Sequence, residues 1–444
     1  MPKNLTQGSV FKTIIVFSLP YLLSYFLQTL YGMADLFIAG QFNGAAVISA
    51  VSIGSQIMHM LTVILVGLAM GTTVLISRAV GASDSARAKK AIGNSALLFL
   101  GTSVAATVLL LALCPFIVRI MQTPLESVVE TQRYLFICFA GIPFITAYNI
   151  FASVYRGLGD SKSPMYFVAV ACVLNIVLDY AFIGGLGMQA TGAALATVLS
   201  QGFSALVSFI AWRRGKQSLR LSRSDFCPEK ETFSGLLKIG VPVACQDGFI
   251  QVSFLLITVI ANRRGVAVAA AVGIVEKIIS FLFLVPSSML SSISAIAAQN
   301  MGAGEHRRAR QTLFYGAGMA VAIGCVFALI FQWLSEPVLR LFTNETAVIT
   351  LGTQYLTSYV FDCVAAAVHF SFSGFFCAYG FSVVSFIHNV CSIVLVRVPG
   401  AWLASKLYPE TLYPMGWAAP AGSALSALIC IAAYLLLQKR GRLG

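Results

Sequence analysis

Long unbroken apolar runs, separated by short polar stretches, occupy nearly the whole chain. A bilayer core about 30 Å thick needs about 20 apolar residues per helix. The runs are continuous and lack the period-two alternation of barrel strands, so they predict membrane-spanning α-helices. Twelve spans are predicted, near residues 14–38, 46–70, 91–114, 131–155, 163–184, 190–212, 235–260, 267–290, 311–335, 353–379, 383–405 and 416–437.

The composition supports an all-α polytopic membrane protein. Of the 444 residues, 58% are hydrophobic and 10% are charged, whereas soluble domains have about 25% charged residues. The first apolar run is too long for a signal peptide and has no Ala-x-Ala-like cleavage site, so we expect a retained first helix. None of the ten cysteines forms a CxxC pair, and we interpret them as reduced, small hydrophobic residues.

The distribution of basic residues predicts the orientation. The net charge is +13, but the basic residues recur in short loops and form no nucleic-acid-binding motif, so nucleic acid is not an expected partner. With the N-terminus inside, 21 of the 29 Lys and Arg residues fall on the cytoplasmic side and 6 on the other. This asymmetry predicts cytoplasmic termini and a multi-pass protein of the bacterial cytoplasmic membrane.

The chain also repeats itself. Gly81-Ala82 and the basic residues after it recur 221 positions later at Gly302-Ala303, and Gly159 pairs with Gly380 at the same offset. Pro20 and Pro242 are 222 positions apart. Six spans per half predict two parallel six-helix bundles related by a pseudo-two-fold axis along the membrane normal. The predicted parts are an N-terminal lobe (1–212), a cytoplasmic linker (213–234) and a C-terminal lobe (235–444).

Five acidic residues lie inside the predicted spans, and none has an acidic counterpart in the other half. A charge near the bilayer centre costs about 2.5–3.5 kcal/mol on insertion scales, so such residues usually mark an ion or substrate path. Asn175 and Asp179 share one face of the fifth span because they are four residues apart. Asp35 and Thr197 reach a similar depth in the first and sixth spans. These residues predict a cation-binding site, to which Asn149 is a deeper addition.

Oxygen ligands that include two carboxylates suit a hard cation, so Asp35 and Asp179 would be the metal ligands if Na⁺ is the coupling ion. Two close carboxylates also suit a proton, because they repel each other when both are ionised. In the alternative interpretation, Asp35 caps a helix end and Asp179 is simply hydrogen-bonded. We expect no cofactor beyond the coupling ion.

Three acids in the second half, Asp247, Glu276 and Asp362, are candidates for a second acidic site or for contacts to a cationic substrate. Glu276 has Lys277 beside it, but neighbouring helical residues point about 100° apart and do not face each other. Asp362 and His369 are interpreted as a packed polar pair, with a proton relay as the alternative.

The whole chain resembles the multidrug and toxic compound extrusion (MATE) family. The resemblance rests on twelve spans in two repeats, on the paired prolines and Gly-Ala loops, and most sharply on Asp35 with Asn175, Asp179 and Thr197, which is similar to the DinF-like branch. It implies an antiporter in which inward Na⁺ or H⁺ drives export of organic, often cationic amphipathic compounds. The implied partners are drug-like small molecules and membrane lipids, and we expect a monomer. Other branches place an essential acid further along the seventh helix than Asp247, so that role is not transferred.

The sequence fits other functions less well. A lipid-linked sugar flippase of the same superfamily should have a larger basic central cavity, for which Lys277 and Arg397 are the basic candidates within the spans. A membrane enzyme would need clustered Asp-rich or His motifs, and the chain contains no DDxxD, HxxxxD or HExxH pattern. The missing GxxxxGK[ST] motif argues against an ATP-driven pump. A channel fits buried unpaired acids less well. We therefore expect a transporter and not an enzyme.

Overall fold

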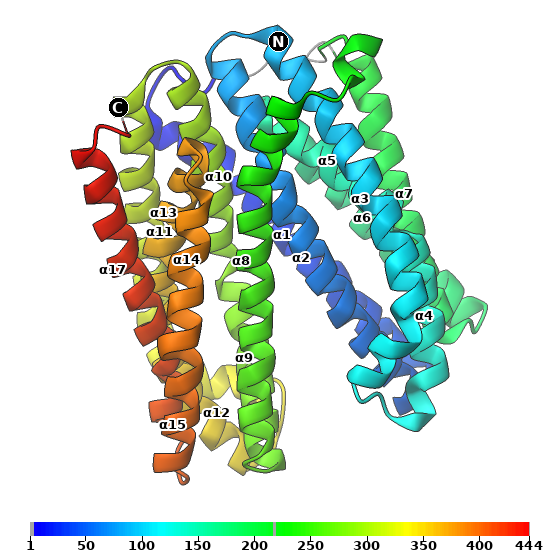
Figure 1. The fold of residues 1–444 in the computed structure, drawn as a ribbon. Helices are drawn as coiled ribbons and strands as arrows, with labels where there is room; N and C mark the ends of the chain where they lie inside the picture. The colour runs from blue at the N-terminus through cyan, green and yellow to red at the C-terminus, as the bar shows by residue number, and fades with distance from the viewer. Residues whose placement is uncertain (1–3, 216–218, 444) are drawn as a thin grey trace. The chain divides into compact units, whose positions relative to one another are not determined.

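The computed structural model describes residues 4–215 and 219–443, and those residues form helices and no strand (Figure 1). Lys3 and Lys216, which the orientation count includes, lie outside the described residues. Eleven described helices are long and apolar enough to cross a membrane, and twelve if one bent pair forms a single span. The predicted all-helical fold with twelve spans is therefore confirmed.

The first half contains seven α-helices. Their bounds are α1 (Val10–Phe42), α2 (Ala45–Gly81), α3 (Ser85–Ile120), α4 (Val128–Ala140), α5 (Ile142–Gly157), α6 (Lys162–Asp179) and α7 (Gln189–Arg214). Shorter elements complete it, namely the 3-10 helices η1 (Leu125–Ser127) and η3 (Arg223–Phe226) and the π-helix η2 (Tyr180–Gly185), which continues α6.

The second half follows the same order. Its helices are α8 (Lys230–Asn262), α9 (Val266–Leu282), α10 (Leu284–Gly302), α11 (His306–Arg340), α12 (Thr346–Tyr359), α13 (Asp362–Tyr379), α14 (Ser382–Ser392), the π-helix η4 (Ile393–Arg397), α15 (Val398–Leu407), α16 (Tyr413–Gly416) and α17 (Ala418–Lys439). Several helices outrun their predicted spans, because backbone hydrogen bonds continue into polar residues where the hydropathy falls. For example, α2 ends at Gly81 and not near residue 70, and α3 begins at Ser85 and not near residue 91.

The fourth predicted span is broken. It consists of residues Leu125–Ala140 and Ile142–Gly157, which meet at an angle of 48° around Gly141. A Cβ at Gly141 would lie 2.4 Å from a methyl group of Val198 in α7, so this glycine allows the close approach of two helices. The tenth predicted span is interrupted in the corresponding place, between α12 and α13. Each half therefore contains one span that is interrupted at the corresponding position.

Backbone conformation also follows the repeat. Gly159 and Gly380, 221 positions apart, both have positive φ values, +85° and +81°. Each follows a helix that ends one or two residues earlier, and glycine adopts this left-handed conformation at little cost. Ser83 and Gly304 form a second pair with positive φ at the same offset.

The chain divides into two compact units. Unit 1 is built on Leu19–Leu237, and unit 2 on Lys238 onward together with Leu5–Ser18. In unit 2 the backbone N–H of Leu5 donates to Gln299 and Arg308 Nη1 donates to the carbonyl of Gly8 at 2.9 Å, which holds the first residues against α10 and α11. The predicted lobe boundaries at 212 and 235 stay a prediction.

Each unit has its own apolar core. In unit 1 one cluster of described residues joins α1, α2, α3, α4, α5 and α7 around fully buried Tyr134, Leu135 and Phe139. In unit 2 the corresponding cluster joins α8, α9, α12 and the chain after α15 around Tyr355, Leu356 and Tyr359. The cysteines are free thiols, as the sequence predicts. Each core therefore packs around an interrupted helix, α4 with α5 in unit 1 and α12 with α13 in unit 2.

Candidate functional site

Four polar side chains from three helices of unit 1 gather in its interior. Asp35 comes from α1, Asn175 and Asp179 lie one turn apart on α6, and Thr197 comes from α7. Their exposed fractions are 2%, 0%, 0% and 9%. Spacing of four residues puts Asn175 and Asp179 on one face, and this face points at Asp35. The structure therefore brings four of the five predicted cation-site residues together.

The contacts centre on the Asp35 carboxylate. Thr197 Oγ1 lies 3.2 Å from Asp35 Oδ2 and 3.0 Å from the carbonyl of Ala193, so its single hydrogen is shared between two acceptors. Asn175 and Asp179 lie close enough to Asp35 for their side chains to interact with it. Even so, Asp35 Oδ1, both Asp179 oxygens and both polar atoms of Asn175 are buried without a hydrogen-bond partner in the described part of the chain.

Unpartnered buried polar atoms are costly, about 1–3 kcal/mol each and more for charged groups. Carboxylate, amide and hydroxyl oxygens are the ligands that a hard monovalent cation prefers, and a proton would relieve the repulsion between two carboxylates. The donor set around Asp35 therefore fits either coupling ion. No group of three or more His, Cys, Asp or Glu residues arranged to hold a metal occurs within residues 4–215 and 219–443.

The fifth predicted residue, Asn149, is buried in α5. Its amide nitrogen donates to the carbonyl of Ile145 at 2.8 Å, within its own helix. The described contacts do not join it to Asp35, so its membership of the site stays a prediction.

Two residues beside the site were missed. Gln201, one turn after Thr197, donates from Nε2 to the hydroxyl of Tyr31 at 3.1 Å. Tyr31 lies one turn before Asp35 and interacts with it electrostatically. Both follow the i, i+4 spacing that identified Asn175 with Asp179, so the signal was present in the sequence. Tyr31 and Gln201 extend the polar group along α1 and α7.

The acids of unit 2 are arranged differently. Asp362 is fully buried at the first turn of α13, and Glu276 is half-buried in α9, where its Oε2 accepts from Thr258 at 3.2 Å. Both lie within electrostatic range of Arg397, a buried residue at the end of η4. Asp247 is half-buried in α8, and no described contact joins it to this group. Lys277 is exposed.

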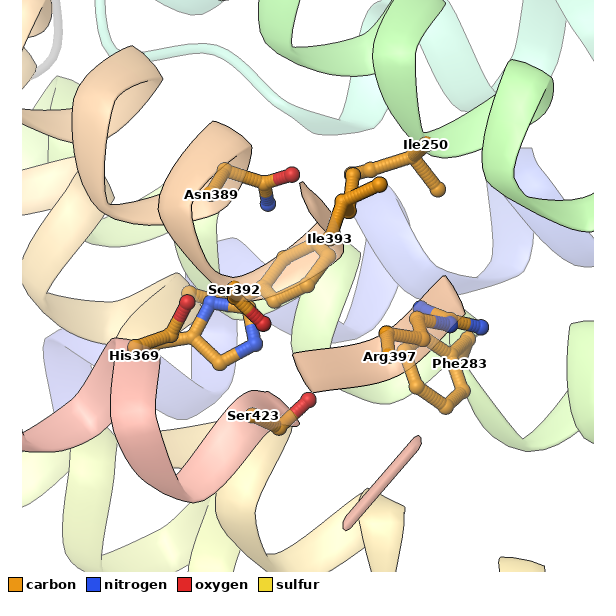
Figure 2. Close-up of a pocket in the computed structure, with 10 residues that line it drawn as sticks. Ile250, Phe283, His369, Asn389, Ser392, Ile393, Arg397 and Ser423 are labelled. Atoms are coloured by element: carbon orange, nitrogen blue, oxygen red, sulfur yellow. The ribbon is translucent and has the colours of Figure 1, made fainter. Parts of the chain in front are cut away.

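A pocket lies beside Arg397 within unit 2 (Figure 2). Polar side chains that include Arg397, His369, Asn389 and Ser423 share its wall with apolar ones such as Phe283. His369 contacts the ring of His388 at 5.5 Å between centroids and makes no described contact with Asp362. His388 is hydrogen-bonded to Ser373 at 2.9 Å and to Ser426 at 3.1 Å. Neither the packed Asp362–His369 pair nor the relay is seen as a direct contact.

Comparison with known proteins settles the family. The sequence model of one family, described as MatE, matches this chain twice, over residues 20–181 and 242–403. The chain belongs to the MatE family. The two matches are 222 positions apart at both ends (20 to 242 and 181 to 403), in line with the internal repeat. The predicted MATE resemblance is confirmed, and the DinF-like branch stays a prediction.

Curated relatives of this MatE protein carry consistent names. The probable multidrug resistance protein YpnP of Bacillus subtilis (strain 168) is 29% identical over 409 residues, which are 91% of each chain. The probable multidrug resistance protein YoeA of the same strain is 26% identical over 98% of this chain and 96% of its own.

A solved MOP superfamily transporter from Pyrococcus furiosus has the same fold, with a TM-score of 0.91, 22% identity and coverage of 98% of this chain and 97% of that one. The family match and the names of the curated relatives confirm the expectation of a multi-pass membrane transporter and not an enzyme.

Proposed function

We propose that this MatE protein is a cation-coupled antiporter that exports organic compounds by alternating access. The observation that carries the proposal is the buried group of Asp35, Asp179, Asn175 and Thr197, which contains two carboxylates and no basic residue. Such a group is stable only when a cation or a proton neutralises it. A site that must be filled to be stable can exchange its occupant across the membrane.

The proposed cycle follows from that charge balance. With the site open to the outside, Na⁺ or H⁺ enters and neutralises Asp35 and Asp179. Neutralisation permits α1, α6 and α7 to pack more closely, because the carboxylates no longer repel each other. The ion drives transport only through its different affinity for the two states. Rearrangement of these helices lowers the affinity for the exported compound while the site faces outward.

The exported compounds are proposed from the names of the relatives, which are multidrug resistance and multidrug export proteins. We propose organic, cationic and amphipathic substrates, because an inward cation exchanges with an outward cation at little electrical cost. The protein would act as a monomer surrounded by lipid in the bacterial cytoplasmic membrane, with both termini inside, as the basic loops indicate. The flippase alternative is not favoured by these relatives.

The test uses purified protein in liposomes, with ethidium as the transported fluorescent cation. A Na⁺ gradient and a pH gradient are imposed separately. Wild-type protein should transport ethidium in response to one of the two gradients. Asp35→Asn and Asp179→Asn should each abolish the response, because each replacement removes one of the two carboxylates that the ion neutralises.

Glu126→Gln is the matched control, because Glu126 is an exposed acid of η1 outside the site and its loss should leave transport unchanged. Full coupling in both aspartate variants would refute the proposed site. No response of folded wild-type protein to either gradient would refute the antiport and redirect attention to lipid-linked substrates.

A further inference from the structure

Unit 2 contains a buried arginine that the proposed cycle does not use. Arg397 is 6% exposed and lies at the end of the π-helix η4. Its Nη2 donates to the hydroxyl of Tyr359 at 2.5 Å, and its guanidinium carbon lies 4.8 Å from the centre of the Phe254 ring. A buried guanidinium in a membrane protein is expensive unless something compensates for its charge.

The compensating groups surround it on several helices. Glu276 of α9, Asp362 of α13, and Tyr355 and Tyr359 of α12 interact with it electrostatically. Neither acid forms an ion pair with Arg397 in the described structure, and Arg397 Nε, both Asp362 oxygens and Glu276 Oε1 are buried without a hydrogen-bond partner there. The guanidinium therefore shares a site with two carboxylates without being locked to either.

The internal repeat gives this position a meaning. The family matches are separated by 222 residues at their ends and Gly159 and Gly380 by 221, so Arg397 falls opposite Asn175 or its neighbour Ile176. In unit 1 Asn175 approaches the carboxylate of Asp35. The first repeat therefore offers a neutral amide beside its acids where the second repeat offers a fixed positive charge. Each repeat has a π-helix in this region: η2 begins five residues after Asn175, and η4 ends at Arg397. Such segments occur often at functional sites.

We propose that unit 2 contains a second cation site whose cation is the guanidinium of Arg397. The buried group in unit 1 has two acids, Asp35 and Asp179, and no basic residue. The group around Arg397 in unit 2 has two acids, Glu276 and Asp362, and one guanidinium. The tethered charge takes the place of one mobile cation in unit 2, so Arg397 limits the number of cations that the protein binds. The role of Arg397 in the ion stoichiometry of transport rests on the proposed function. The cation site itself can be tested without a transport assay.

The direct test is cation binding by Arg397→Gln. Purified variant and wild-type protein in detergent are titrated from about pH 10 to about pH 5, a range that covers displaced carboxylate protonation, and ²²Na⁺ binding is measured in parallel. The variant should take up one more positive charge per protein than the wild type, as a proton or as Na⁺. The double variant Arg397→Gln/Asp362→Asn restores the original charge balance and should bind the same number as the wild type.

A second measurement probes the shape of the site. Arg397→Ala leaves space for a free guanidinium, so ethylguanidinium should raise its melting temperature toward the wild-type value, whereas the neutral analogue ethylurea should not. Arg156 of unit 1 provides the matched control. It is equally buried, stacks on Tyr21 with 3.8 Å between its guanidinium carbon and the ring centre, and interacts electrostatically with Tyr21, Tyr148 and Tyr25. Arg156→Gln should therefore gain no cation binding.

The outcomes separate this inference from the proposed function. If Arg397→Gln binds no extra proton or Na⁺ and ethylurea stabilises Arg397→Ala as well as ethylguanidinium does, the second site is refuted, whatever the transport assays show. If ethidium export fails in the wild type but Arg397→Gln gains one cation, the site stands and the antiport falls. Should Arg397→Gln not fold, the double variant and Arg397→Ala with ethylguanidinium still decide the question.

Discussion

Replacing Gly93 by alanine should release the charged linker from α3. The 3-10 helix η3 lies directly on this glycine, and an added Cβ would be 2.1 Å from the carbonyl oxygen of Asp225 and 2.6 Å from its carbonyl carbon. Ordinary carbon–oxygen contacts are about 3.3–3.6 Å. The linker backbone must therefore move by about 1 Å or more, because the helix itself cannot yield.

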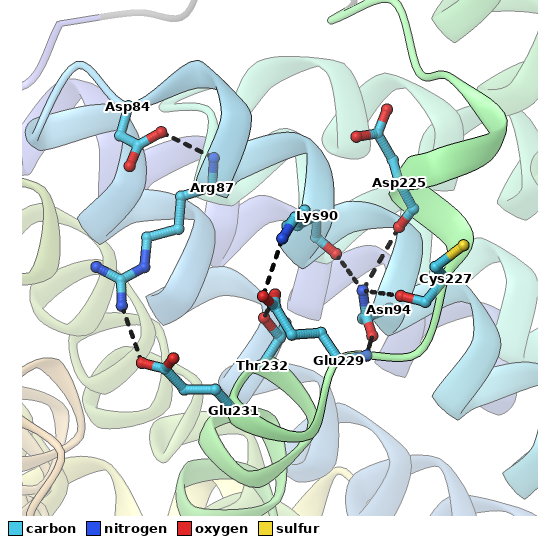
Figure 3. A network of polar contacts seen from close by, with 9 residues as sticks. All are labelled: Asp84, Arg87, Lys90, Asn94, Asp225, Cys227, Glu229, Glu231 and Thr232. Atoms are coloured by element: carbon cyan, nitrogen blue, oxygen red, sulfur yellow. Dashed lines mark hydrogen bonds and ion pairs between the residues drawn. The ribbon is translucent and has the colours of Figure 1, made fainter.

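That movement breaks the hydrogen bonds of the neighbouring residue, Asn94 (Figure 3). Asn94 Oδ1 accepts from the backbone N–H of Glu229 at 2.8 Å, and Nδ2 donates to the carbonyls of Asp225 at 3.5 Å and Cys227 at 3.3 Å. Each such bond contributes about 0.5–1.5 kcal/mol net. Loss of two of these bonds weakens the attachment of the linker by about 1–3 kcal/mol.

The assay is limited proteolysis of the folded protein in detergent, with trypsin cleaving after Arg220 and Arg223. When opening is fast relative to cleavage, the rate follows the open population, so about 1–3 kcal/mol predicts about 5–150-fold faster cleavage. Gly101→Ala is the control on the same helix, because a Cβ there meets nothing within 4 Å. If Gly93→Ala is cleaved no faster than Gly101→Ala, the linker is not held by this contact.

Two further predictions concern unit 1. Hydrogen bonds from the backbone and side chain of Ser222 lower the pKa of Asp225, and those from Thr232 and Lys90 lower the pKa of Glu229. A carboxyl group whose pKa is lowered in the folded protein stabilises the attached linker when the pH is above the pKa of the unfolded chain, and this stabilisation is lost as the pH falls. Protection of the linker from pepsin should therefore be constant above about pH 4 and decline below it. A digestion rate that does not change through that range would contradict the assignment. Tyr21→Phe keeps the ring face under Arg156 but removes the hydroxyl that accepts from Nη1 at 2.9 Å, so thermal or denaturant unfolding should show a loss of about 1.5–3 kcal/mol, against no change for Tyr166→Phe, an exposed tyrosine.

The membrane-spanning helices were predictable because lipid imposes a simple rule on them. Each spanning segment must be apolar over about 20 residues, and the continuous runs satisfy this without any tertiary information. Helix ends were less accessible, since a helix that leaves the bilayer continues into polar residues, as α2 does up to Gly81. The break at Gly141 leaves no signal in the hydropathy of the chain. Glycine is needed there because Val198 approaches closely, and this contact is visible only in the folded structure.

The candidate site in unit 1 could be predicted from the sequence for a related reason. Asn175 and Asp179 share a face through helix periodicity, and the depth of Asp35 and Thr197 follows from the order of the spans. The group around Arg397 could not be predicted from the sequence. Glu276, Asp362 and Arg397 come from three elements far apart in the sequence, and their meeting depends on how α9, α13 and η4 pack. Local spacing therefore could not predict this group.

The two units thus differ most in the charges placed on a common scaffold. One family model fits both repeats, and the repeats share the interrupted helix and the positive-φ residues at Gly159 and Gly380. Features that serve folding are expected in both copies, because each copy must bury the same kind of apolar faces. The acids and Arg397 follow no such symmetry, and each costs stability where it lies. The repeat without these charges folds in the same way, so the fold does not require them. Transport explains them best, because it needs a site that is unstable until a cation fills it.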